Sequence, residues 1–399
     1  MKSGWPTKTL GAVCEVMNGG TPKTGVPQYW DGSHLWITPA EMGKRLSPYV
    51  SGTERKITDL GLRNSSAQML PPNSVILSSR APIGHLVINT EPMATNQGCK
   101  GLISGSQLHH KFLYYYLTSA VELLNSLGAG ATFKELSGGK LKEVTIPVPP
   151  LPEQQRIVSI LDEAFDGIAT AKAKAEKNLE NARALFESHL QSVFTQRGPG
   201  WVETTLSRAT DGIFIGPFGS LLHKSDYVAN GIPLVNPAHI TEVGIEPDLR
   251  KTVSKTTALR LKNYIMREGD IVIGRRGEMG RCALVTEVED GWLCGTGSFF
   301  IKPSSRCDTR YLVRFLRSDG CKARLEKIAG GAVMPNLSNT DLGNLVFDLP
   351  PFDRQITIVD EIDSLHEETQ RVARLYERKL AALDELKKSL LYQAFSGQL

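Results

Sequence analysis

One stretch of the sequence occurs twice, and this repeat limits the possible architectures. The first copy begins VPPLPEQQRIVSILDEAF at Val148, and the second begins LPPFDRQITIVDEIDSLH at Leu349. The copies align without a gap, so that Gln154 and Leu161 of the first correspond to Gln355 and Ile362 of the second. A single repetition at such a distance indicates two tandem halves and excludes a solenoid of short repeats.

Each copy has the signals of a long helix. A Pro-Pro pair and an acidic residue stand where a helix N-terminus favours them. Apolar residues then recur at alternating steps of four and three, which predicts a seam for a partner helix. The predicted seam residues are Ile157, Leu161, Ala164, Ile168, Ala171, Ala175, Asn178, Ala182, Leu185 and His189 in the first copy. In the second they are Ile358, Ile362, Leu365, Thr369, Val372, Tyr376, Lys379, Leu383, Leu386 and Leu390. The simplest partner of each helix is the other copy, and two independent surface helices are the alternative.

Composition agrees with an intracellular globular protein. The chain has 399 residues, of which 41% are hydrophobic and 22% charged, enough for two or three units with ordinary cores. No apolar leader or membrane-spanning run is visible, so we expect a cytoplasmic protein. The six cysteines lack any C-x-x-C pair, and we expect packed thiols without zinc or disulfides.

Positive charge is concentrated outside the repeated helices. Residues 1–148 hold 14 basic and 9 acidic side chains, and residues 200–348 hold 19 and 17. The helical stretches have the opposite balance, with 6 basic and 7 acidic residues in 149–199 and 7 and 9 in 349–399. A polyanion would therefore meet the globular parts first.

The two globular parts also echo each other. Residues 1–148 show short strands and Gly-Pro turns, with strand candidates at 35–38, 74–78 and 85–88 and a helix candidate at 111–124. Residues 200–348 repeat this plan. LPPNSVILSSRAPIG aligns with MREGDIVIGRRGEMG, which matches Arg80 to Arg276 and Gly84 to Gly280.

No catalytic motif is recognisable. The nearest approach to a [DN]-P-P-[YF] methyltransferase loop is Asp348-Leu-Pro-Pro-Phe352, which an inserted leucine spoils. A G-x-G-x-x-G cofactor loop fails at Phe300, and no G-x-x-x-x-G-K-[ST] loop exists. Pro247-Asp248 lacks the acid-x-Lys partner of a nuclease, and the histidines have no metal-binding spacing. We therefore predict no catalytic, cofactor-binding or metal-binding residues in this chain.

The repeat junctions resemble a known family. GATFKELSGGKLKEVTIPVPPLPEQQRIVSILDEA (from Gly130) and GAVMPNLSNTDLGNLVFDLPPFDRQITIVDEID (from Gly331) are similar to the junctions in DNA-specificity subunits of Type I restriction-modification systems. GDIVIGRRGEMG also resembles an element of that family's target recognition domains. The similarity extends over both globular parts and both helices.

The resemblance implies an α+β fold with four parts. These are target recognition domain 1 (1–148), a central long spacer helix (149–199), target recognition domain 2 (200–348) and a C-terminal long spacer helix (349–399). It implies that the helices pack as an antiparallel coiled coil and that each domain reads half of a split double-stranded DNA target. Two methyltransferase subunits and restriction/translocase subunits would be the partners. S-adenosylmethionine, ATP and Mg²⁺ would belong to those partners, and this chain would be non-catalytic.

Candidate DNA contacts follow from the chemistry of base reading. Arginine and lysine suit guanine, and asparagine and glutamine suit adenine, when they are presented from turns. The candidates are Thr38, Arg80, Asn96, Gln97 and Lys134 in the first domain and Asn236, His239, Arg275, Arg276 and Asn336 in the second. For Arg80 and Arg276, bracing of the turn is an equal alternative. Residues shared by both domains suit framework or phosphate contacts, and specifying residues should differ.

Two other functions are open at this point. The chain could be a single-chain DNA methyltransferase or nuclease with degenerate motifs, and binding of S-adenosylmethionine by the isolated chain would favour that class. It could also be a coiled-coil scaffold that binds only protein, in which case salt-dependent binding to duplex DNA would be missing.

Overall fold

The computed structural model describes residues 5–45, 47–80, 82–130, 134–218, 221–329 and 336–399. The chain forms two compact units. The first unit comprises Met1–Glu176 and Glu377–Leu399, and the second comprises Lys177–Tyr376. Each unit therefore contains one globular part and a segment of both long helices.

The first unit is built from short strands and short helices before its first long helix begins. Its strands are β1 (Thr7–Thr9), β2 (Cys14–Asn18), β3 (Trp30–Ile37), β4 (Tyr49–Val50), β5 (Arg55–Ile57), β6 (Val75–Ser79), β7 (Ile83–Asn89), β8 (Met93–Thr95), β9 (Cys99–Ser104) and β10 (Thr145–Pro147). Its helices are α1 (Leu10–Val13), η1 (Pro27–Tyr29), α2 (Pro39–Met42), α3 (Asp59–Arg63), α4 (His110–Ser119), α5 (Val121–Leu127), α6 (Gly138–Glu143) and the start of α7 (Leu151–Thr195).

Two sheets organise this unit. One has the order β2-β9-β6-β7-β4, and the other has the order β5-β3-β8, with β3 and β8 parallel. Strand β6, in the middle of the larger sheet, is buried along its whole length, which explains its apolar run from Val75 to Leu77. The strand candidates at 35–38, 74–78 and 85–88 correspond to β3, β6 and β7, although Thr38 and Ser74 lie just outside the strands. The helix predicted for 111–124 is divided in two at Ala120, where the backbone leaves helical geometry.

The second unit follows the same order of elements. Its strands are β11 (Val202–Thr205), β12 (Thr210–Ile215), β13 (Tyr227–Val228), β14 (Leu234–Val235), β15 (Thr252–Val253), β16 (Ile271–Gly274), β17 (Cys282–Leu284), β18 (Leu293–Cys294), β19 (Ser298–Pro303) and β20 (Val346–Leu349). Its helices are α8 (Leu206–Ala209), η2 (Lys224–Asp226), η3 (Pro237–His239), α9 (Lys255–Arg260), η4 (Lys262–Tyr264), η5 (Glu287–Glu289), α10 (Thr309–Arg317), α11 (Asp319–Ile328), α12 (Asn339–Gly343) and the start of α13 (Phe352–Ser396).

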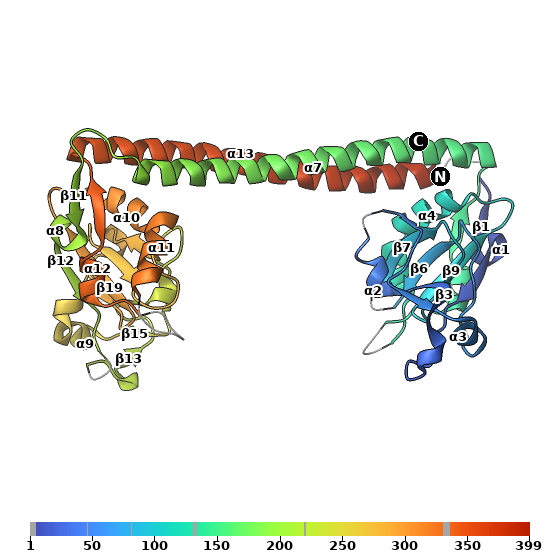
Figure 1. Cartoon of the computed structure of the whole chain (residues 1–399), viewed down its shortest axis with the longest axis horizontal. Helices are drawn as coiled ribbons and strands as arrows, with labels where there is room; N and C mark the ends of the chain where they lie inside the picture. The colour runs from blue at the N-terminus through green and yellow to red at the C-terminus, as the bar shows by residue number, and fades with distance from the viewer. Residues whose placement is uncertain (1–4, 46, 81, 131–133, 219–220, 330–335) are drawn as a thin grey trace. The chain divides into compact units, whose positions relative to one another are not determined.

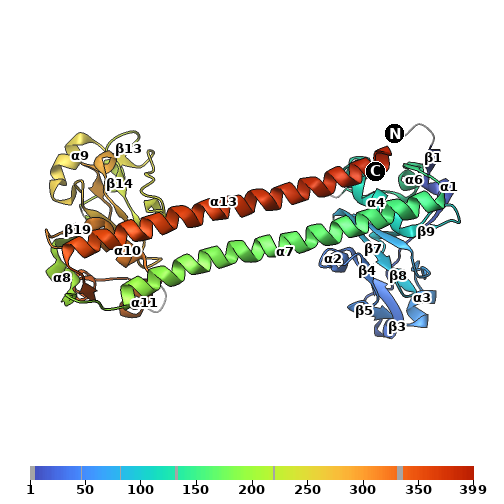
Figure 2. The same cartoon turned by 90° about the horizontal axis from the view of Figure 1, so that it is seen from above.

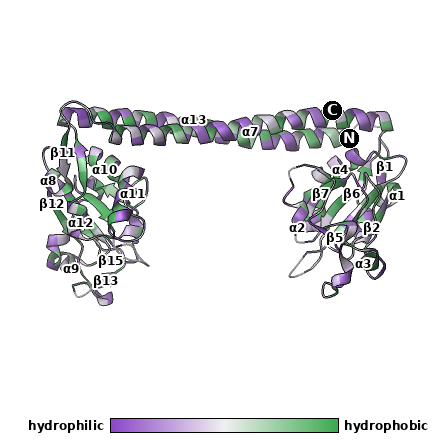
Figure 3. Cartoon of the chain, viewed as in Figure 1, coloured by the Kyte–Doolittle hydropathy of each residue, from purple (hydrophilic) through white to green (hydrophobic). Residues whose placement is uncertain are grey.

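Its sheets reproduce those of the first unit. The order β12-β19-β16-β17 corresponds to β2-β9-β6-β7, and the parallel pair β14-β18 corresponds to β3-β8. The opening and closing strands also pair in both units, β1 with β10 and β11 with β20. Figure 3 shows largely hydrophobic strands inside each globular part, while hydrophobic and hydrophilic residues alternate along the long helices.

Each unit holds an antiparallel pair of helical segments. In the first unit Arg156 donates to the Leu399 carbonyl oxygen (2.8 Å), and the Lys172 ammonium lies 2.8 Å from the Asp384 carboxylate. Residue numbers rise along α7 as they fall along α13, so the segments run in opposite directions (Figures 1 and 2). In the second unit the Asn178 side chain donates to the Tyr376 hydroxyl (3.0 Å) with the same polarity.

The seam between the segments departs from the predicted heptads. Ile157, Leu161 and Ala175 are buried as predicted, but Leu185 is 66% exposed and Leu386 is 47% exposed. The predicted seam residues His189 and Lys379 are exposed as well. Phe186 is buried instead, with its ring 5.1 Å from that of His366. An α-helix has 3.6 residues per turn, so a strict 3.5-residue register drifts off the contact face over this length.

Aromatic contacts attach each globular part to its helical segments. Phe112 of α4 meets Phe395 of α13 edge to face, with ring centroids 5.1 Å apart. In the second unit Tyr311 of α10 meets Phe194 of α7 in the same way at 5.5 Å. The repeat alignment pairs Phe194 with Phe395, so the two contacts are equivalent.

A buried glutamine joins the start of each long helix to its globular part. The Gln154 side chain accepts from the His109 backbone N–H (2.8 Å) and donates to the carbonyl oxygens of Gln107 (2.9 Å) and Pro149 (2.8 Å). It is fully buried. All three partners belong to backbone groups, so this side chain fixes the angle at which the helix leaves the globular part.

Gln355 makes the same three bonds in the second unit. It accepts from the Asp308 backbone N–H (2.7 Å) and donates to the carbonyl oxygens of Arg306 (2.9 Å) and Pro350 (2.8 Å). It is also fully buried. The repeated Pro-Pro and glutamine of the sequence therefore form a repeated structural joint.

The six cysteine thiols are all buried, which confirms the prediction of packed thiols. Within the described ranges, no helix is long and apolar enough to cross a membrane.

Candidate nucleic-acid interface

Three separate segments meet where β6 ends in the first unit. Ser79 donates its backbone N–H to the Gly98 carbonyl oxygen (2.8 Å), and Leu136 donates to the Ser79 carbonyl oxygen (2.8 Å). Arg80 forms a backbone bridge with Glu135, and its guanidinium lies 3.8 Å from the Glu135 carboxylate. Arg80 is about a third exposed and is held at the junction of three loops.

The second unit builds the same junction where β16 ends. Arg275 donates its backbone N–H to the Gly297 carbonyl oxygen (3.0 Å), and Leu337 donates to the Arg275 carbonyl oxygen (2.9 Å). Arg276 forms the backbone bridge with Asn336. The structure therefore places Arg276 at the position of Arg80, as the sequence alignment predicts.

A fourth segment joins the junction through the parallel strand pair. Asn96 donates its backbone N–H to the Ile37 carbonyl oxygen (2.9 Å), which brings Thr38 beside it. In the second unit Gly295 donates to Val235 (2.9 Å) and so brings in Asn236.

Glycines at this junction permit close approach. A Cβ atom at Gly98 would lie 3.1 Å from both Arg80 Nε and Asn96 Oδ1, so these two side chains are neighbours. A Cβ atom at Gly295 would lie 2.2 Å from Asn236 Oδ1, which only glycine avoids. The predicted residues on different loops are thus brought together in each unit.

The amide of Asn96 is engaged within the first unit. Its Nδ2 donates to the Thr21 hydroxyl (3.0 Å), and its Oδ1 accepts from the Gly98 backbone N–H (2.7 Å). The Thr21 hydroxyl donates in turn to Gln97 Oε1. Gln97 is exposed, and its amide nitrogen has no hydrogen bond to another described residue. Asn96 therefore braces the loop, while Gln97 has a donor available.

In the second unit, Asn336 and His239 also make internal contacts. Asn336 Oδ1 lies 3.2 Å from Arg275 Nε and 3.4 Å from Arg276 Nε, and it accepts from both. His239 Nδ1 lies 2.8 Å from the Leu234 carbonyl oxygen and 3.3 Å from the Asn236 backbone nitrogen, so its ring is held against its own loop.

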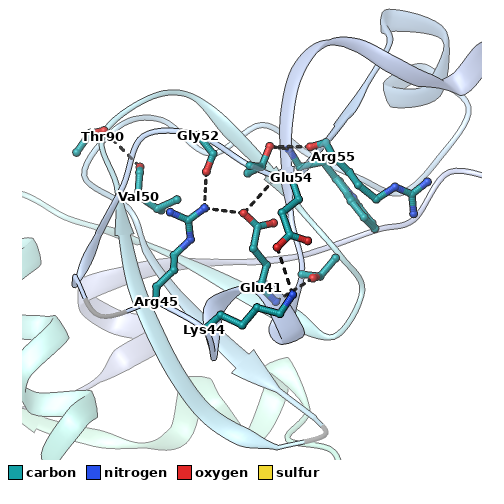
Figure 4. Close-up of polar contacts among 11 residues, drawn as sticks. Glu41, Lys44, Arg45, Val50, Gly52, Glu54, Arg55 and Thr90 are labelled. Carbon is teal, nitrogen blue, oxygen red and sulfur yellow. Dashed lines mark hydrogen bonds and ion pairs between the residues drawn. The ribbon is translucent and has the colours of Figure 1, made fainter.

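The turn that begins at Thr38 is braced by a buried ion pair. The Thr38 hydroxyl accepts from the Glu41 backbone N–H (3.3 Å) and caps α2. Glu41 is 5% exposed, and its carboxylate lies 2.6 Å from the Arg45 guanidinium and accepts from the Glu54 backbone N–H (3.1 Å). Arg45 also donates to the Gly52 carbonyl oxygen (2.6 Å), so one ion pair ties two loops together (Figure 4).

Lys134 is exposed beside Glu135 and close to the 128–130 turn, because a Cβ atom at Gly128 would lie 3.3 Å from Lys134 Cβ. All ten predicted contact residues thus lie on the junction or on a segment bound to it. Among residues that the structure describes, no group of three histidine, cysteine or acidic side chains could hold a metal ion.

Comparison with known proteins supports an assignment. A family model described as "Type I restriction modification DNA specificity domain" matches residues 2–181 and 220–377, well over half of the chain. The chain belongs to this family.

Two curated members show the extent of the likeness. The chain is 28% identical over 372 residues to the Type I restriction enzyme MjaIX specificity subunit of Methanocaldococcus jannaschii, which covers 87% of this chain and 83% of the relative. It is 33% identical over 171 residues to the EcoR124I/EcoR124II specificity subunit of Escherichia coli, covering 41% of each.

Solved structures show the same fold. The HsdS subunit from Thermoanaerobacter tengcongensis matches with a TM-score of 0.67 at 19% identity, covering 100% of this chain and 98% of the other. A chain from a structural study of complex assembly and conformational transition of the type I R-M system matches with a TM-score of 0.79 at 20% identity, covering 100% and 99%. The predicted α+β fold with two long helices is confirmed.

The sequence interpretation of this Type I specificity protein missed Lys100. This lysine lies on β9 beside the junction and is 6% exposed. Neither spacing nor a motif marks it, and its place follows only from the hydrogen-bond register of β6 and β9.

Proposed function

We propose that the chain is the sequence-specific DNA-binding subunit of a Type I restriction-modification complex. Each globular part reads one half of a bipartite target. The chain is not an enzyme, and methylation and cleavage are carried out by the subunits that dock on it.

One observation carries this proposal. Both units build the same four-segment junction from backbone hydrogen bonds, yet the side chains that the junction presents differ. A shared frame with different polar side chains is what two domains need in order to read two different short sequences from equivalent positions. The equivalent pairs whose polar side chains differ and are not buried are Thr38 and Asn236, and Glu135 and Asn336.

The partners follow from the family and from the chemistry that the chain lacks. Two methyltransferase subunits would supply S-adenosylmethionine-dependent methylation, and restriction/translocase subunits would supply ATP- and Mg²⁺-dependent translocation and cleavage. The complex would act on chromosomal DNA in the cytoplasm.

Methylation mapping tests this function. Deleting the gene from its host should remove methylation from one bipartite motif, made of two short sequences separated by an unspecified gap. Restoring the gene should restore that methylation. Unchanged methylation at every motif, or loss at an uninterrupted motif, would contradict the proposal. Binding of S-adenosylmethionine by the purified chain would favour the single-chain enzyme instead.

A further inference from the structure

Lys100 is largely buried, with 6% of the residue exposed. Among the residues that the structure describes, none forms a hydrogen bond or ion pair with its ammonium. Burial lowers the pKa of the Lys100 ammonium, the Glu135 carboxylate opposes this effect, and the Arg80 charge adds to it. A charge that is largely removed from water is unfavourable unless opposite charge lies near it. One carboxylate, Glu135, lies near the two cations Lys100 and Arg80, so a further anion would stabilise this site.

The second unit brings a cation to the same region from another part of the chain, because Arg275 directly follows β16. Lys100 pairs with Leu77 across β6 and β9, and Phe299 pairs with Ile273 across β16 and β19. Phe299 is therefore the structural equivalent of Lys100. The guanidinium of Arg275 lies over the Phe299 ring, 5.6 Å from its centroid, so it reaches the region that Lys100 occupies in the first unit.

Arg275 is also nearly buried, with 8% of its surface exposed. Burial lowers the pKa of Arg275, and the charge of Arg276 lowers it further. Its equivalent in the first unit is Ser79. Ser79 donates its backbone N–H to the Gly98 carbonyl oxygen, as Arg275 does to that of Gly297. The first unit thus has Ser79 and Lys100 at the two positions where the second unit has Arg275 and Phe299.

A more exposed arginine accompanies the buried cation in each unit. Arg80 is the neighbour of Lys100, and Arg276 is the neighbour of Arg275. We propose that Lys100 with Arg80, and Arg275 with Arg276, form a two-cation site in each unit that binds a phosphate group of the DNA backbone. This inference rests on the proposed DNA-binding function and names the part of the DNA that the site holds.

Phosphate fits these sites better than a base does. Bidentate reading of guanine needs the planar fork of arginine in one fixed place, whereas a phosphate contact needs positive charge near an oxygen atom. A lysine on β9 of the first unit and an arginine directly after β16 of the second occupy the same region, so positive charge is the property that the two sites share. A site common to both units also cannot account for two different half-sites, whereas phosphate contacts are independent of sequence.

Binding of the full chain with its methyltransferase subunits tests the site. Fluorescence anisotropy with a labelled target duplex and a shuffled duplex, over a series of KCl concentrations, gives affinity and salt slope. Lys100→Met should weaken binding to both duplexes about tenfold, as expected for one charged hydrogen bond, and should reduce the salt slope by about one. Lys100→Arg should bind like the wild type.

Lys142→Met is the matched control, because Lys142 is exposed on α6 and its loss removes the same charge. It should leave affinity and slope unchanged. A compensating exchange is the sharpest variant. Lys100→Phe alone should lose affinity, and Ser79→Arg combined with Lys100→Phe should recover it, because the pair recreates the arrangement of the second unit.

The outcomes are distinguishable. If the wild-type complex binds DNA and Lys100→Met is folded by circular dichroism with unchanged affinity and slope, the phosphate site is refuted and the proposed function stands. A loss confined to the target duplex would indicate a base contact and would also refute it. Failure of the wild-type complex to bind any duplex would overturn the proposed function itself. If Lys100→Met does not fold, Arg275→Met tests the equivalent site of the second unit. It should weaken binding to both duplexes about tenfold and reduce the salt slope by about one.

Discussion

Replacing Gln355 by leucine should loosen the joint between the second globular part and α13. The substitution keeps the side chain's approximate size and removes all three of its hydrogen bonds. The Asp308 N–H and two carbonyl oxygens then remain in a buried place without their partner. Each buried unsatisfied group costs about 1–3 kcal/mol, so the loss of all three bonds should cost the joint roughly 3–9 kcal/mol. That loss is a large share of the ~5–15 kcal/mol that stabilises a typical domain.

Hydrogen–deuterium exchange measures this loss where it occurs. A loss of at least ~3 kcal/mol should speed exchange of the Asp308 amide roughly 10²-fold, since each ~1.4 kcal/mol is a factor of ten. Gln154→Leu should do the same to the His109 amide and leave Asp308 unchanged, so each variant is the control for the other. Gln196→Leu provides a surface control, because Gln196 is exposed and, among the described residues, bonds only to the hydroxyl and the backbone of Ser192. Unchanged exchange at Asp308 in a folded Gln355→Leu protein would refute this role of the glutamine.

Three further predictions concern DNA. Arg80→Ala and Arg276→Ala should each weaken binding to all duplexes and lower the salt slope by about one, measured by anisotropy; relaxation of a single base position at ~1–3 kcal/mol would instead identify a guanine contact. Inserting four residues between Ala171 and Ala182 should lengthen the unspecified gap by about two base pairs, from ~1.5 Å per helical residue and ~3.4 Å per base pair. Methylation mapping would show it, and an unchanged gap in an active variant would mean that α7 does not set the distance. The purified chain alone should neither methylate nor cut DNA, and methyl transfer from labelled S-adenosylmethionine without added subunits would contradict this.

The internal repeat was the most informative feature of the sequence. It predicts two tandem halves, the start of each long helix and the equivalence of Arg80 and Arg276. Each of these depends on a short sequence signal that occurs in both halves and aligns without a gap. The long helices were predicted from apolar spacing. The prediction that Leu185 and Leu386 lie in the seam was wrong, because both side chains are exposed. Heptad counting assumes a repeat of 3.5 residues, and a helix of 3.6 residues per turn leaves that register over several turns.

The junction of the candidate interface could be predicted only in part. Arg80 and Asn336 were found because turn residues with suitable side chains stand out in the sequence. Lys100 was not found, because the offset between the repeats changes across the loops that separate the strands. Its equivalence to Phe299, and the exchange of cation positions with Arg275, become visible only once β6 and β9 are paired in register.

Exchange of one domain tests the central claim most directly. Residues 1–148 are replaced by the matching domain of another family member, and the methylated motif of a host carrying the chimera is mapped. If each globular part reads its own half-site, one half of the motif should change to that of the donor, while the other half stays as in the wild type. A motif in which both halves change, or an active chimera in which neither does, would contradict the account.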